Sequence, residues 1–192
     1  MGFLSAGGYF VSFMSGNTTR LAVDLATDPA SATLPALLIA GFALGAFIGA
    51  IVALKSGGWQ ARNVLALSTM LLIAGAVAQV AGSGPLALAA MVLAMGTLNN
   101  AFQREGYSSF GLTYMTGAVV RFGQGLAYRL CGRPIEGFGG LLALWAALGG
   151  GAVLGALAYG RMGETAIVLA AVPAIIALGA AALSGQAPDD QP

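Results

Sequence analysis

Long apolar runs alternate with short polar turns along this chain of 192 residues. A helix that crosses a bilayer needs about 20 apolar residues, because each residue adds about 1.5 Å to its length. Five stretches meet this requirement and predict transmembrane helices: residues 33–54, 63–81, 85–103, 137–159 and 165–183. The opening apolar run, residues 1–13, is too short to cross alone.

Polar turns separate these runs. Residues 55–62 (KSGGWQAR), 81–85 (AGSGP) and 161–164 (RMGE) predict tight loops, and residues 184–192 predict a disordered acidic tail. Glycine and proline inside the apolar runs are compatible with helices, because membrane helices tolerate both. The whole chain, residues 1–192, is therefore predicted to form one all-α membrane domain.

Composition strengthens this prediction. The chain is 58% hydrophobic and only 8% charged, whereas about a quarter of the residues in a soluble domain are charged. It has no histidine and one cysteine, Cys131, which argues against histidine-based catalysis or metal binding and against an intramolecular disulfide. We expect a polytopic transmembrane helical bundle that has no metal or other cofactor, binds no nucleic acid and is not an enzyme.

The basic residues predict an orientation, because cytoplasmic loops collect lysine and arginine. If the 55–62 loop lies inside, two basic residues lie outside, Arg20 and Arg161. The other six then lie on the cytoplasmic side: Lys55, Arg62, Arg104, Arg121, Arg129 and Arg133. We therefore expect a cytoplasmic C-terminus.

One polar motif interrupts the apolar pattern twice. FVSFMSGNTTRLA (residues 10–22) and GLTYMTGAVVRFG (residues 111–123) align with Met14 on Met115, Gly16 on Gly117 and Arg20 on Arg121. Two glycines and the cation after them recur further along: Gly45 and Gly49 with Gly151 and Gly155, and Lys55 with Arg161. The shared order indicates an internal repeat, with copies at residues 1–81 and 85–183.

Three predicted helices lie between the two motifs. An odd number reverses the second copy relative to the first, so the pattern predicts a three-plus-three inverted repeat, which is typical of secondary transporters. The second copy opens with a complete helix, residues 85–103, whereas the first has only residues 1–13 at that place. We expect that this sequence lacks most of the first copy's first helix; the alternative is that this copy evolved shorter.

The motifs also carry a family resemblance. GGYFVSFMSGNTTRLA (residues 7–22), NNAFQREG (99–106) and TYMTGAVVRFGQGLA (113–127) resemble the YoaK, or DUF1275, family of bacterial membrane proteins, over essentially the whole chain. The resemblance implies an integral inner-membrane protein and brings no settled activity with it. Family members usually begin with a full helix that ends in a Gly-aromatic-X-Asp-Ala type of stretch. Only GFLSAGG (residues 2–8) stands in its place, in agreement with a truncated first helix.

Serine, threonine and asparagine are favoured at helix N-caps, so the motifs predict broken or re-entrant helices. At Ser15, Gly16 and Asn17, and again at Thr116 and Gly117, one short helix is expected to stop and another to start. Irregular backbone within a membrane is tolerated where protein buries it or where it lines a wet cavity. Inverted repeats would bring the two breaks together near the middle of the membrane.

Two helix N-termini and two arginines would make this region positive. Arg20 and Arg121 follow the breaks by about one turn. Hydroxyl groups add donors and acceptors beside them: Ser15, Thr18, Thr19 and Thr116. The sequence therefore predicts a pathway for a small polar solute, with an anion as the specific hypothesis.

A structural role is the alternative for these residues. Arginines near helix ends commonly reach to the membrane interface, and Arg20 is placed to pair with Asp24 one turn further on. Asn99 and Asn100 stand at the end of the second copy's first helix, where amides also make interhelical hydrogen bonds. We keep both asparagines as candidate pathway residues.

Small residues are spaced for close packing of helices. Gly41, Gly45 and Gly49 form one stripe on a single helix, and Gly151 and Gly155 repeat part of it. Such residues let membrane helices approach closely. We expect packing within the chain, with a homodimer face as the alternative.

These patterns together predict an inner-membrane transporter or channel that lies in the lipid bilayer and conducts a small solute between the two Ser/Thr-Gly breaks. A non-transporting scaffold or regulatory protein is the alternative, because few polar groups lie within the predicted spans. An intramembrane enzyme is disfavoured, because the spans contain no pair of carboxylates at depth.

Overall fold

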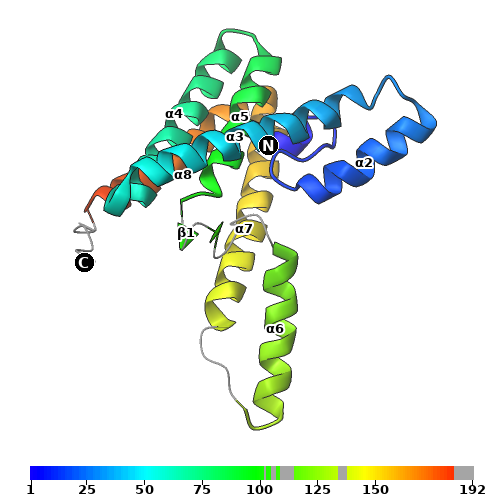
Figure 1. Ribbon diagram of the computed structural model, residues 1–192. Coiled ribbons are helices and arrows are strands. Elements are labelled where there is room, and N and C mark those ends of the chain that lie inside the picture. Colours follow the sequence, from blue (N-terminus) through cyan, green and yellow to red (C-terminus); the bar gives the residue numbers. More distant parts are fainter. Residues whose placement is uncertain (102, 105–106, 109–114, 134–137, 184–192) are drawn as a thin grey trace.

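The protein is almost entirely helical (Figure 1). The structure is a computed structural model that describes residues 1–101, 103–104, 107–108, 115–133 and 138–183. Its α-helices are α1 (Gly2–Ser5), α2 (Met14–Thr27), α3 (Thr33–Lys55), α4 (Gln60–Val80), α5 (Gly84–Leu98), α6 (Met115–Leu130), α7 (Phe138–Met162) and α8 (Ala171–Leu183). The other elements are the 3₁₀ helices η1 (Gly57–Trp59) and η2 (Gly163–Ala170) and the antiparallel two-residue strands β1 (Gln103–Arg104) and β2 (Tyr107–Ser108). The predicted all-α bundle is confirmed, and the predicted tail lies outside the described residues.

Helices α3, α4 and α5 form the centre of the bundle, and α5 packs along both of the others. The predicted spans 33–54 and 63–81 correspond closely to α3 and α4. One apolar cluster joins α4 and α5 to the last part of the chain: Leu72, Met91, Ala94, Ile167 and Ala171. Burial of these side chains fixes α5 between its neighbours.

The contact between α3 and α5 depends on glycine. A Cβ atom added to Gly45 would collide with the carbonyl oxygen of Leu93, and one added to Gly49 would lie 2.8 Å from the carbonyl oxygen of Thr97. Gly41 also faces α5. The two backbones therefore approach closely along a stripe of small residues, which is the packing mode that membrane helices favour.

Helix α5 ends at Leu98, earlier than the predicted boundary at residue 103. The backbone N–H groups of Asn99, Asn100 and Ala101 donate to carbonyl oxygens three residues earlier, at 3.0–3.3 Å. Such bonds tighten the last turn and stop the helix. The predicted span was too long because the polar amides begin a turn rather than continue the apolar helix.

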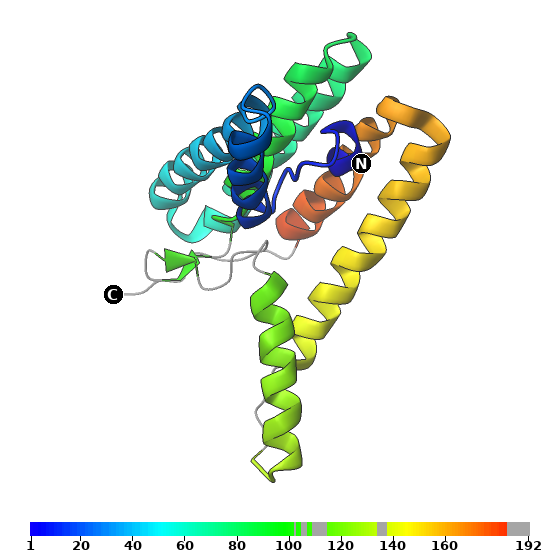
Figure 2. The same cartoon turned by 90° about the vertical axis from the view of Figure 1, so that its right-hand side faces the viewer.

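The predicted spans 137–159 and 165–183 are both helical in their described residues, 138–159 and 165–183. Helix α7 ends at Met162, and the chain then turns back through η2 and α8 (Figure 2), both of which pack against α4. Gly163 makes this turn with a φ of 60°, which glycine adopts without steric cost. The last predicted span is therefore 3₁₀ helix in its first part and α-helix only from Ala171.

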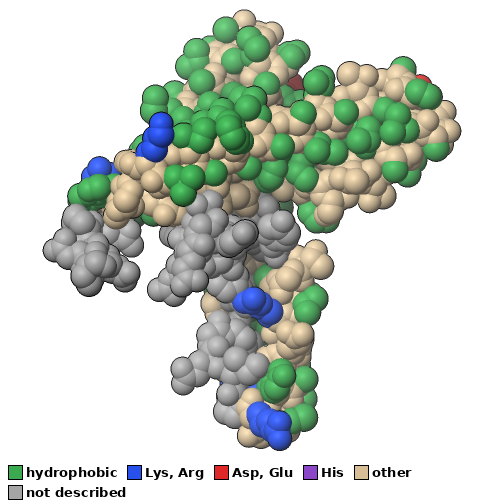
Figure 3. Space-filling model, in the orientation of Figure 1, with side chains coloured by type: hydrophobic (Ala, Val, Ile, Leu, Met, Phe, Trp, Pro, Cys, Tyr) green, Lys and Arg blue, Asp and Glu red, His purple; other side chains and the backbone are tan. Residues whose placement is uncertain are grey.

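Three helical stretches of the described chain are long and apolar enough to cross a membrane: Thr33–Lys55, Gly57–Val80 and Leu142–Leu183. Helix α5 is apolar but shorter, with 15 residues. Hydrophobic side chains are spread over the visible face of the bundle, and lysine and arginine are confined to a few places (Figure 3). This surface suits contact with lipid.

Some helix contacts join corresponding elements of the two predicted copies. Helix α2 packs against α3, and α6, the helix of the second motif, packs against α7. Helix α4 packs against η2 and α8, so the last helices of the two predicted copies meet. The inverted relation of the two copies stays a prediction.

Candidate functional site

The first motif runs into the start of α2. The interruption between the two helices lies before residue 14, in the first residues of the motif and the turn that precedes them. Helix α1 ends at Ser5, where Gly7 and Gly8, with φ of 62° and 91°, turn the chain. Residues 9–13 are not helical, and α2 begins at Met14 with Phe13 at its N-cap and no side-chain cap. The predicted caps at residues 15–17 were therefore placed too late, because glycines at positive φ end the preceding helix.

Asn17 fixes this non-helical segment to α2. Its side chain is fully buried. The Oδ1 atom accepts the backbone N–H of Phe10 at 2.8 Å, and Nδ2 donates to the carbonyl oxygen of Phe10 at 2.6 Å. One amide thus satisfies both backbone groups of a residue that has no helix or strand partner.

Gly16 allows two aromatic rings to cover the same turn. A Cβ atom at Gly16 would lie 2.8 Å from Cε1 of Phe13 and 3.0 Å from Cε2 of Phe10. The two rings pack edge to face, with their centroids 5.3 Å apart. The glycine in this motif is therefore required by local packing.

The hydroxyl groups of the first motif turn toward their own helix. Thr18 donates to the carbonyl oxygen of Met14 at 2.9 Å, and Thr19 donates to that of Ser15 at 3.2 Å. Both threonines and Ser15 are exposed. The two threonine hydroxyl groups therefore already donate within α2. Their oxygen atoms can still accept a hydrogen bond from another group.

Arg20 lies over the turn before α2 and contacts an aromatic ring. Its guanidinium carbon is 5.3 Å from the centroid of the Tyr9 ring. A Cβ atom at Gly8 would lie 3.8 Å from one of its terminal nitrogens. The Tyr9 hydroxyl donates to Oδ2 of Asp24 at 2.7 Å. Arg20 thus makes a cation–π contact, and no ion pair with Asp24 is present among the described contacts.

The carboxylate of Asp24 has a second effect on Tyr9. The hydrogen bond from the phenol to Asp24 raises the pKa of Tyr9 above its ordinary value of 10.0, because ionisation would place two negative charges side by side. The Tyr9 hydroxyl therefore stays protonated and donates to Asp24, whose Oδ2 atom accepts this hydrogen bond. The expected pairing of Arg20 with Asp24 is replaced by this three-residue arrangement.

A cavity of about 320 Å³ opens beside Tyr9, next to the start of α3. It is lined by Tyr9, Ala30, Ser31, Thr33, Leu34 and Leu37. The lining combines three hydroxyl groups with an apolar wall. Ser31 donates to Oδ2 of Asp28 at 2.6 Å, so the two acidic residues of this region, Asp24 and Asp28, both accept hydrogen bonds from hydroxyl groups.

The second motif also lies at a helix start. Helix α6 begins at Met115, one residue before Thr116, and both Thr116 and Gly117 are exposed. Arg121 follows on the same helix and is exposed. Ahead of this motif, Tyr107 and Ser108 form β2, and residues 109–114 lie outside the described residues. Helices α2 and α6 are not side by side (Figures 1 and 2), so the structure does not bring Arg20 and Arg121 together.

The asparagines at the end of α5 contact neighbouring helices. Asn100 is buried, and its Nδ2 donates to the carbonyl oxygen of Ala46 in α3 at 3.0 Å. Asn99 donates to the carbonyl oxygen of Met95 in its own helix at 2.8 Å. Gln60 of α4 donates to the carbonyl oxygen of Asn100 at 3.1 Å. The contacts of Asn100 therefore hold the end of α5 to the start of α4 and to the middle of α3.

The second glycine pair has different surroundings from the first. A Cβ atom at Gly151 would meet nothing within 4 Å among the described residues. At Gly155 it would lie 3.4 Å from the amino nitrogen of Met1. Close helix packing is therefore present at Gly45 and Gly49 but not at Gly151.

The sequence patterns missed two kinds of polar residue. Tyr9 precedes Arg20 by more than ten positions, and they meet because the non-helical residues 9–13 fold back along α2, where Asn17 holds Phe10. Thr97 and Ser68 were read as parts of apolar runs, yet they donate to the carbonyl oxygens of Gly45 and Ala94 at 3.1 and 3.0 Å. A hydroxyl beside glycine or alanine on a facing helix is the signal that could have identified these bonds.

Spanning helices, lipid-facing surfaces and buried polar contacts between helices define a multi-pass membrane protein. The family model described as "Protein of unknown function (DUF1275)" matches residues 1–180. The chain belongs to this family.

A transmembrane relative supports the same assignment. The chain is 32% identical over 182 residues to the "UPF0700 transmembrane protein RA0705" of Rhizobium meliloti (strain 1021), a match that covers 94% of this chain and 78% of that protein. No solved structure matches the chain.

Proposed function

We propose that this protein is a transporter or channel for a small polar or anionic solute, and that Arg20 and Arg121 supply positive charge at two separate places along its path. The observation that carries the proposal is the placement of Arg20. Its guanidinium lies on the Tyr9 ring while the nearest acid on the same helix face, Asp24, accepts the Tyr9 hydroxyl. The arginine charge is thus left to attract an anion.

The two arginine-bearing helices have a form that suits this role. Helix α2 has 14 residues and α6 has 16, so both are shorter than a membrane span. Polar residues recur along each: Asn17, Arg20 and Asp24 on α2, and Arg121, Gln124 and Tyr128 on α6. Short amphipathic helices beside longer apolar ones are suited to line a polar path.

The hydroxyl-lined cavity beside Tyr9 fits the outer end of such a path. Its volume of about 320 Å³ suits a small solute. The candidate pathway residues are Ser15, Gly16, Asn17, Thr18, Arg20, Asn99, Asn100, Thr116, Gly117 and Arg121. Of these, Asn17 and Asn100 have a supporting role: their side-chain amides donate to backbone carbonyl oxygens and so fix the segments beside the path.

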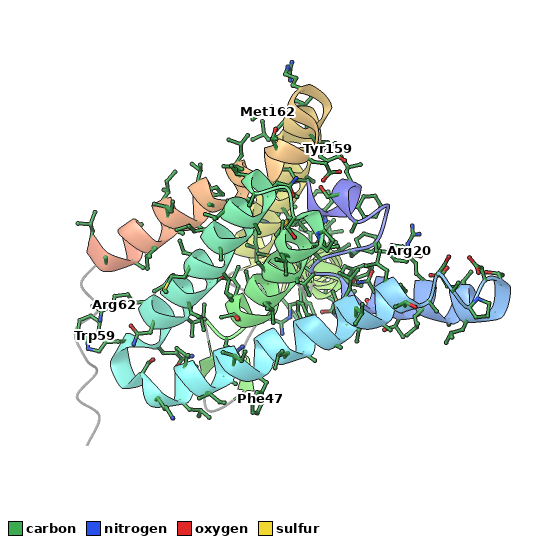
Figure 4. The ribbon with its side chains drawn as sticks, turned by 90° about the horizontal axis from the view of Figure 1, so that it is seen from above. Arg20, Phe47, Trp59, Arg62, Tyr159 and Met162 are labelled. Atoms are coloured by element: carbon green, nitrogen blue, oxygen red, sulfur yellow. The ribbon has the colours of Figure 1, made fainter. Side chains whose placement is uncertain are left out.

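We further infer that the protein lies in the bacterial inner membrane with a cytoplasmic C-terminus, surrounded by lipid, and that it is not an enzyme. The orientation follows from the basic residues near one end of α4, Lys55 and Arg62. Arg62 stacks on Trp59 with its guanidinium carbon 4.0 Å from the ring centroid, away from Arg20 (Figure 4). Tryptophan beside a cation is typical of a membrane interface.

Flux measurements in proteoliposomes test the transport proposal. Small inorganic anions, small carboxylates and neutral polyols would be screened with the wild-type protein. The double variant Arg20→Gln/Arg121→Gln is expected to lower anion flux by about tenfold or more, since each lost charge–anion contact corresponds to about 1.5–3 kcal/mol. Arg161→Gln is the matched control, because Arg161 is exposed at the far end of α7. Unaltered flux in the double variant would end the anion proposal.

A non-transporting scaffold is the second candidate, and buried polar groups favour it. Ser68, Thr69, Thr97 and Asn100 are buried within the bundle, and each donates to a backbone carbonyl oxygen. A water-soluble thiol reagent distinguishes the two candidates in a Cys131→Ser background. Protection of cysteines placed at positions 15, 16, 116 and 117 from both sides of the membrane would favour the scaffold.

A further inference from the structure

The turn between α3 and α4 gathers positive charge at one end of the bundle. Lys55 is the last residue of α3, and Arg62 lies in the first turn of α4. Helices α3, α4 and α5 and the short helix η1 contain no other cation and no acidic residue. No carboxylate on these four elements therefore neutralises the two positive charges.

Arg62 is held in a geometry that suits phosphate. Its guanidinium carbon is 4.0 Å from the centroid of the Trp59 ring, at the end of the bundle where α3 meets α4 (Figure 4). The ring covers one face of the guanidinium, whereas the N–H groups lie around its edge. A planar set of donors of this kind binds phosphate through two parallel hydrogen bonds.

Side-chain hydrogen bonds fix the turn that carries the two cations. Asn63 donates to Oγ of Ser56 at 3.0 Å, and Ser56 donates to the carbonyl oxygen of Val52 at 2.6 Å. Gln60 donates to the carbonyl oxygen of Asn100 in the turn after α5, at 3.1 Å. The backbone that carries both cations is thus already ordered, which lowers the entropic cost of binding a ligand.

An apolar stripe leads away from Lys55 along the outside of α3. Ile51, Ile48 and Leu44 precede Lys55 at helical spacing, so the four residues share one face of the helix. All are exposed, and the neighbouring Phe47 points outward from α3 (Figure 4). The stripe is about 16 Å long at about 1.5 Å per residue. This is close to the hydrocarbon depth of one leaflet, which is half of about 30 Å.

A cationic end and an apolar stripe of this length match the two parts of a phospholipid. The phosphate suits the cations, and an acyl chain suits the stripe. A zwitterionic headgroup brings an ammonium group next to its phosphate, and Lys55 and Arg62 repel that ammonium. An anionic headgroup brings no such charge, so the charge of this surface favours the anionic lipid.

We propose that the end of α3 and the start of α4 bind one anionic phospholipid. Its phosphate accepts hydrogen bonds from the ammonium group of Lys55 and the guanidinium of Arg62. One of its acyl chains lies along Ile51, Ile48 and Leu44. This proposal does not depend on the transport function.

Photo-cross-linking in vesicles of known composition tests this site. The protein is reconstituted with equal amounts of phosphatidylglycerol, which is anionic, and phosphatidylethanolamine, which is zwitterionic. A benzophenone amino acid replaces Phe47, beside the stripe, and in a separate variant Leu37, near the start of the same helix. The two side chains are matched in exposure, at 63% and 64%. The lipid in each adduct is identified by mass spectrometry.

The adducts at Phe47 are expected to favour phosphatidylglycerol by about tenfold or more, since each cation near a membrane surface contributes about fivefold. The preference should fall as salt is added, because ions screen the charges. Leu37 lies at the other end of α3 from Lys55 and should give the two lipids equally. Equal adducts at Phe47 would overturn the proposal, and so would the same preference at both positions. A cross-link from Phe47 to a second copy of the chain would also overturn it, because this face would then be a protein interface.

Removal of the two cations tests their role. In Lys55→Gln/Arg62→Gln the adducts at Phe47 should return to equal amounts of the two lipids. Arg161→Gln is the matched control, because Arg161 is an exposed cation near the end of α7 and should leave the preference unchanged. An unchanged preference in the double variant would overturn the proposal.

A single variant covers the case in which the double variant does not accumulate in the membrane. Lys55 is exposed at the end of its helix, so Lys55→Gln leaves the stacked Arg62 and the fixed turn in place. The preference for phosphatidylglycerol at Phe47 should fall by about fivefold, and Lys55→Arg should retain it. A Lys55→Gln protein with the full preference would count against the site as strongly as the double variant.

Discussion

Asn17 binds Phe10 through both atoms of its amide, at 2.8 Å to the backbone N–H and 2.6 Å to the carbonyl oxygen. Phe10 lies in the non-helical segment between α1 and α2, where no helix supplies partners for its backbone. The pairing imitates one step of a strand ladder, with a side chain in place of a strand. It explains why an asparagine stands at the centre of the first motif.

Replacement of Asn17 should therefore destabilise the protein. Asn17→Ala leaves a donor and an acceptor of Phe10 without partners, and each such group costs about 1–3 kcal/mol. The free energy of unfolding in detergent should fall by about 2 kcal/mol or more. Thr18→Ala is the matched control, because the exposed Thr18 hydroxyl bonds only within α2. Equal effects of the two substitutions would contradict the role of Asn17.

Gly45 should not tolerate even a methyl group. In Gly45→Ala the new Cβ collides with the carbonyl oxygen of Leu93, so α3 and α5 must move apart. Overpacking of this kind costs about 1–3 kcal/mol, which thermal unfolding in detergent would detect. In Gly149→Ala on α7 the new Cβ meets nothing within 4 Å among the described residues, so this change should be neutral or slightly stabilising, because alanine is the better helix former. A neutral Gly45→Ala would show that the helices are not in close contact.

The hydroxyl group of Thr97 should contribute to the stability of the protein. It is fully buried, and it donates to the carbonyl oxygen of Gly45 at 3.1 Å. Thr97→Val keeps the shape and removes that bond, so unfolding should become easier by about 0.5–2 kcal/mol, the range for hydrogen bonds between membrane helices. Thr19→Val serves as the control, since Thr19 is exposed and bonds only within α2. The difference between the two variants measures the interhelical bond.

Most of the bundle could be predicted from apolar length alone. Helices α3 and α4 match their predicted spans because long uncharged runs on either side of a short loop with two cations, Lys55 and Arg62, have few alternatives in a membrane. The end of α5 could not be predicted in this way. Asn99 and Asn100 are compatible with either a helix or a turn. Their backbone N–H groups donate to the carbonyl oxygens of Gly96 and Thr97, three residues earlier, and this pattern forms a turn.

The candidate site was less predictable. The first motif contains Asn17 and Arg20, but their partners, Phe10 and Tyr9, are set by the way the non-helical residues 9–13 fold back along α2. The spacing of four residues along a helix predicts that Arg20 pairs with Asp24. It cannot include Tyr9, which reaches both residues only after the chain folds back.

The Tyr9 hydroxyl should control the charge available at Arg20. In Tyr9→Phe the ring remains but Asp24 loses its donor, so Asp24 becomes free to pair with Arg20 one turn away. Anion flux in proteoliposomes should fall toward that of Arg20→Gln, and Tyr9→Phe/Asp24→Asn should restore it. Tyr159→Phe is the matched control, because its hydroxyl also donates to a carboxylate, Oε1 of Glu164, at 2.6 Å. Failure of the Asp24→Asn change to restore flux would contradict this coupling.

The orientation can be tested at the two ends of α4. This helix has 21 residues and is about 30 Å long at about 1.5 Å per residue, enough to place its ends on opposite sides of a bilayer. In a Cys131→Ser background, Gly58→Cys should react with an impermeant thiol reagent only after the membrane is opened. Ala81→Cys should react in intact spheroplasts. Lys55 and Arg62 flank the first position, so it is expected on the cytoplasmic side. The reverse labelling pattern would invert the topology and place the Arg20–Tyr9 group on the cytoplasmic face.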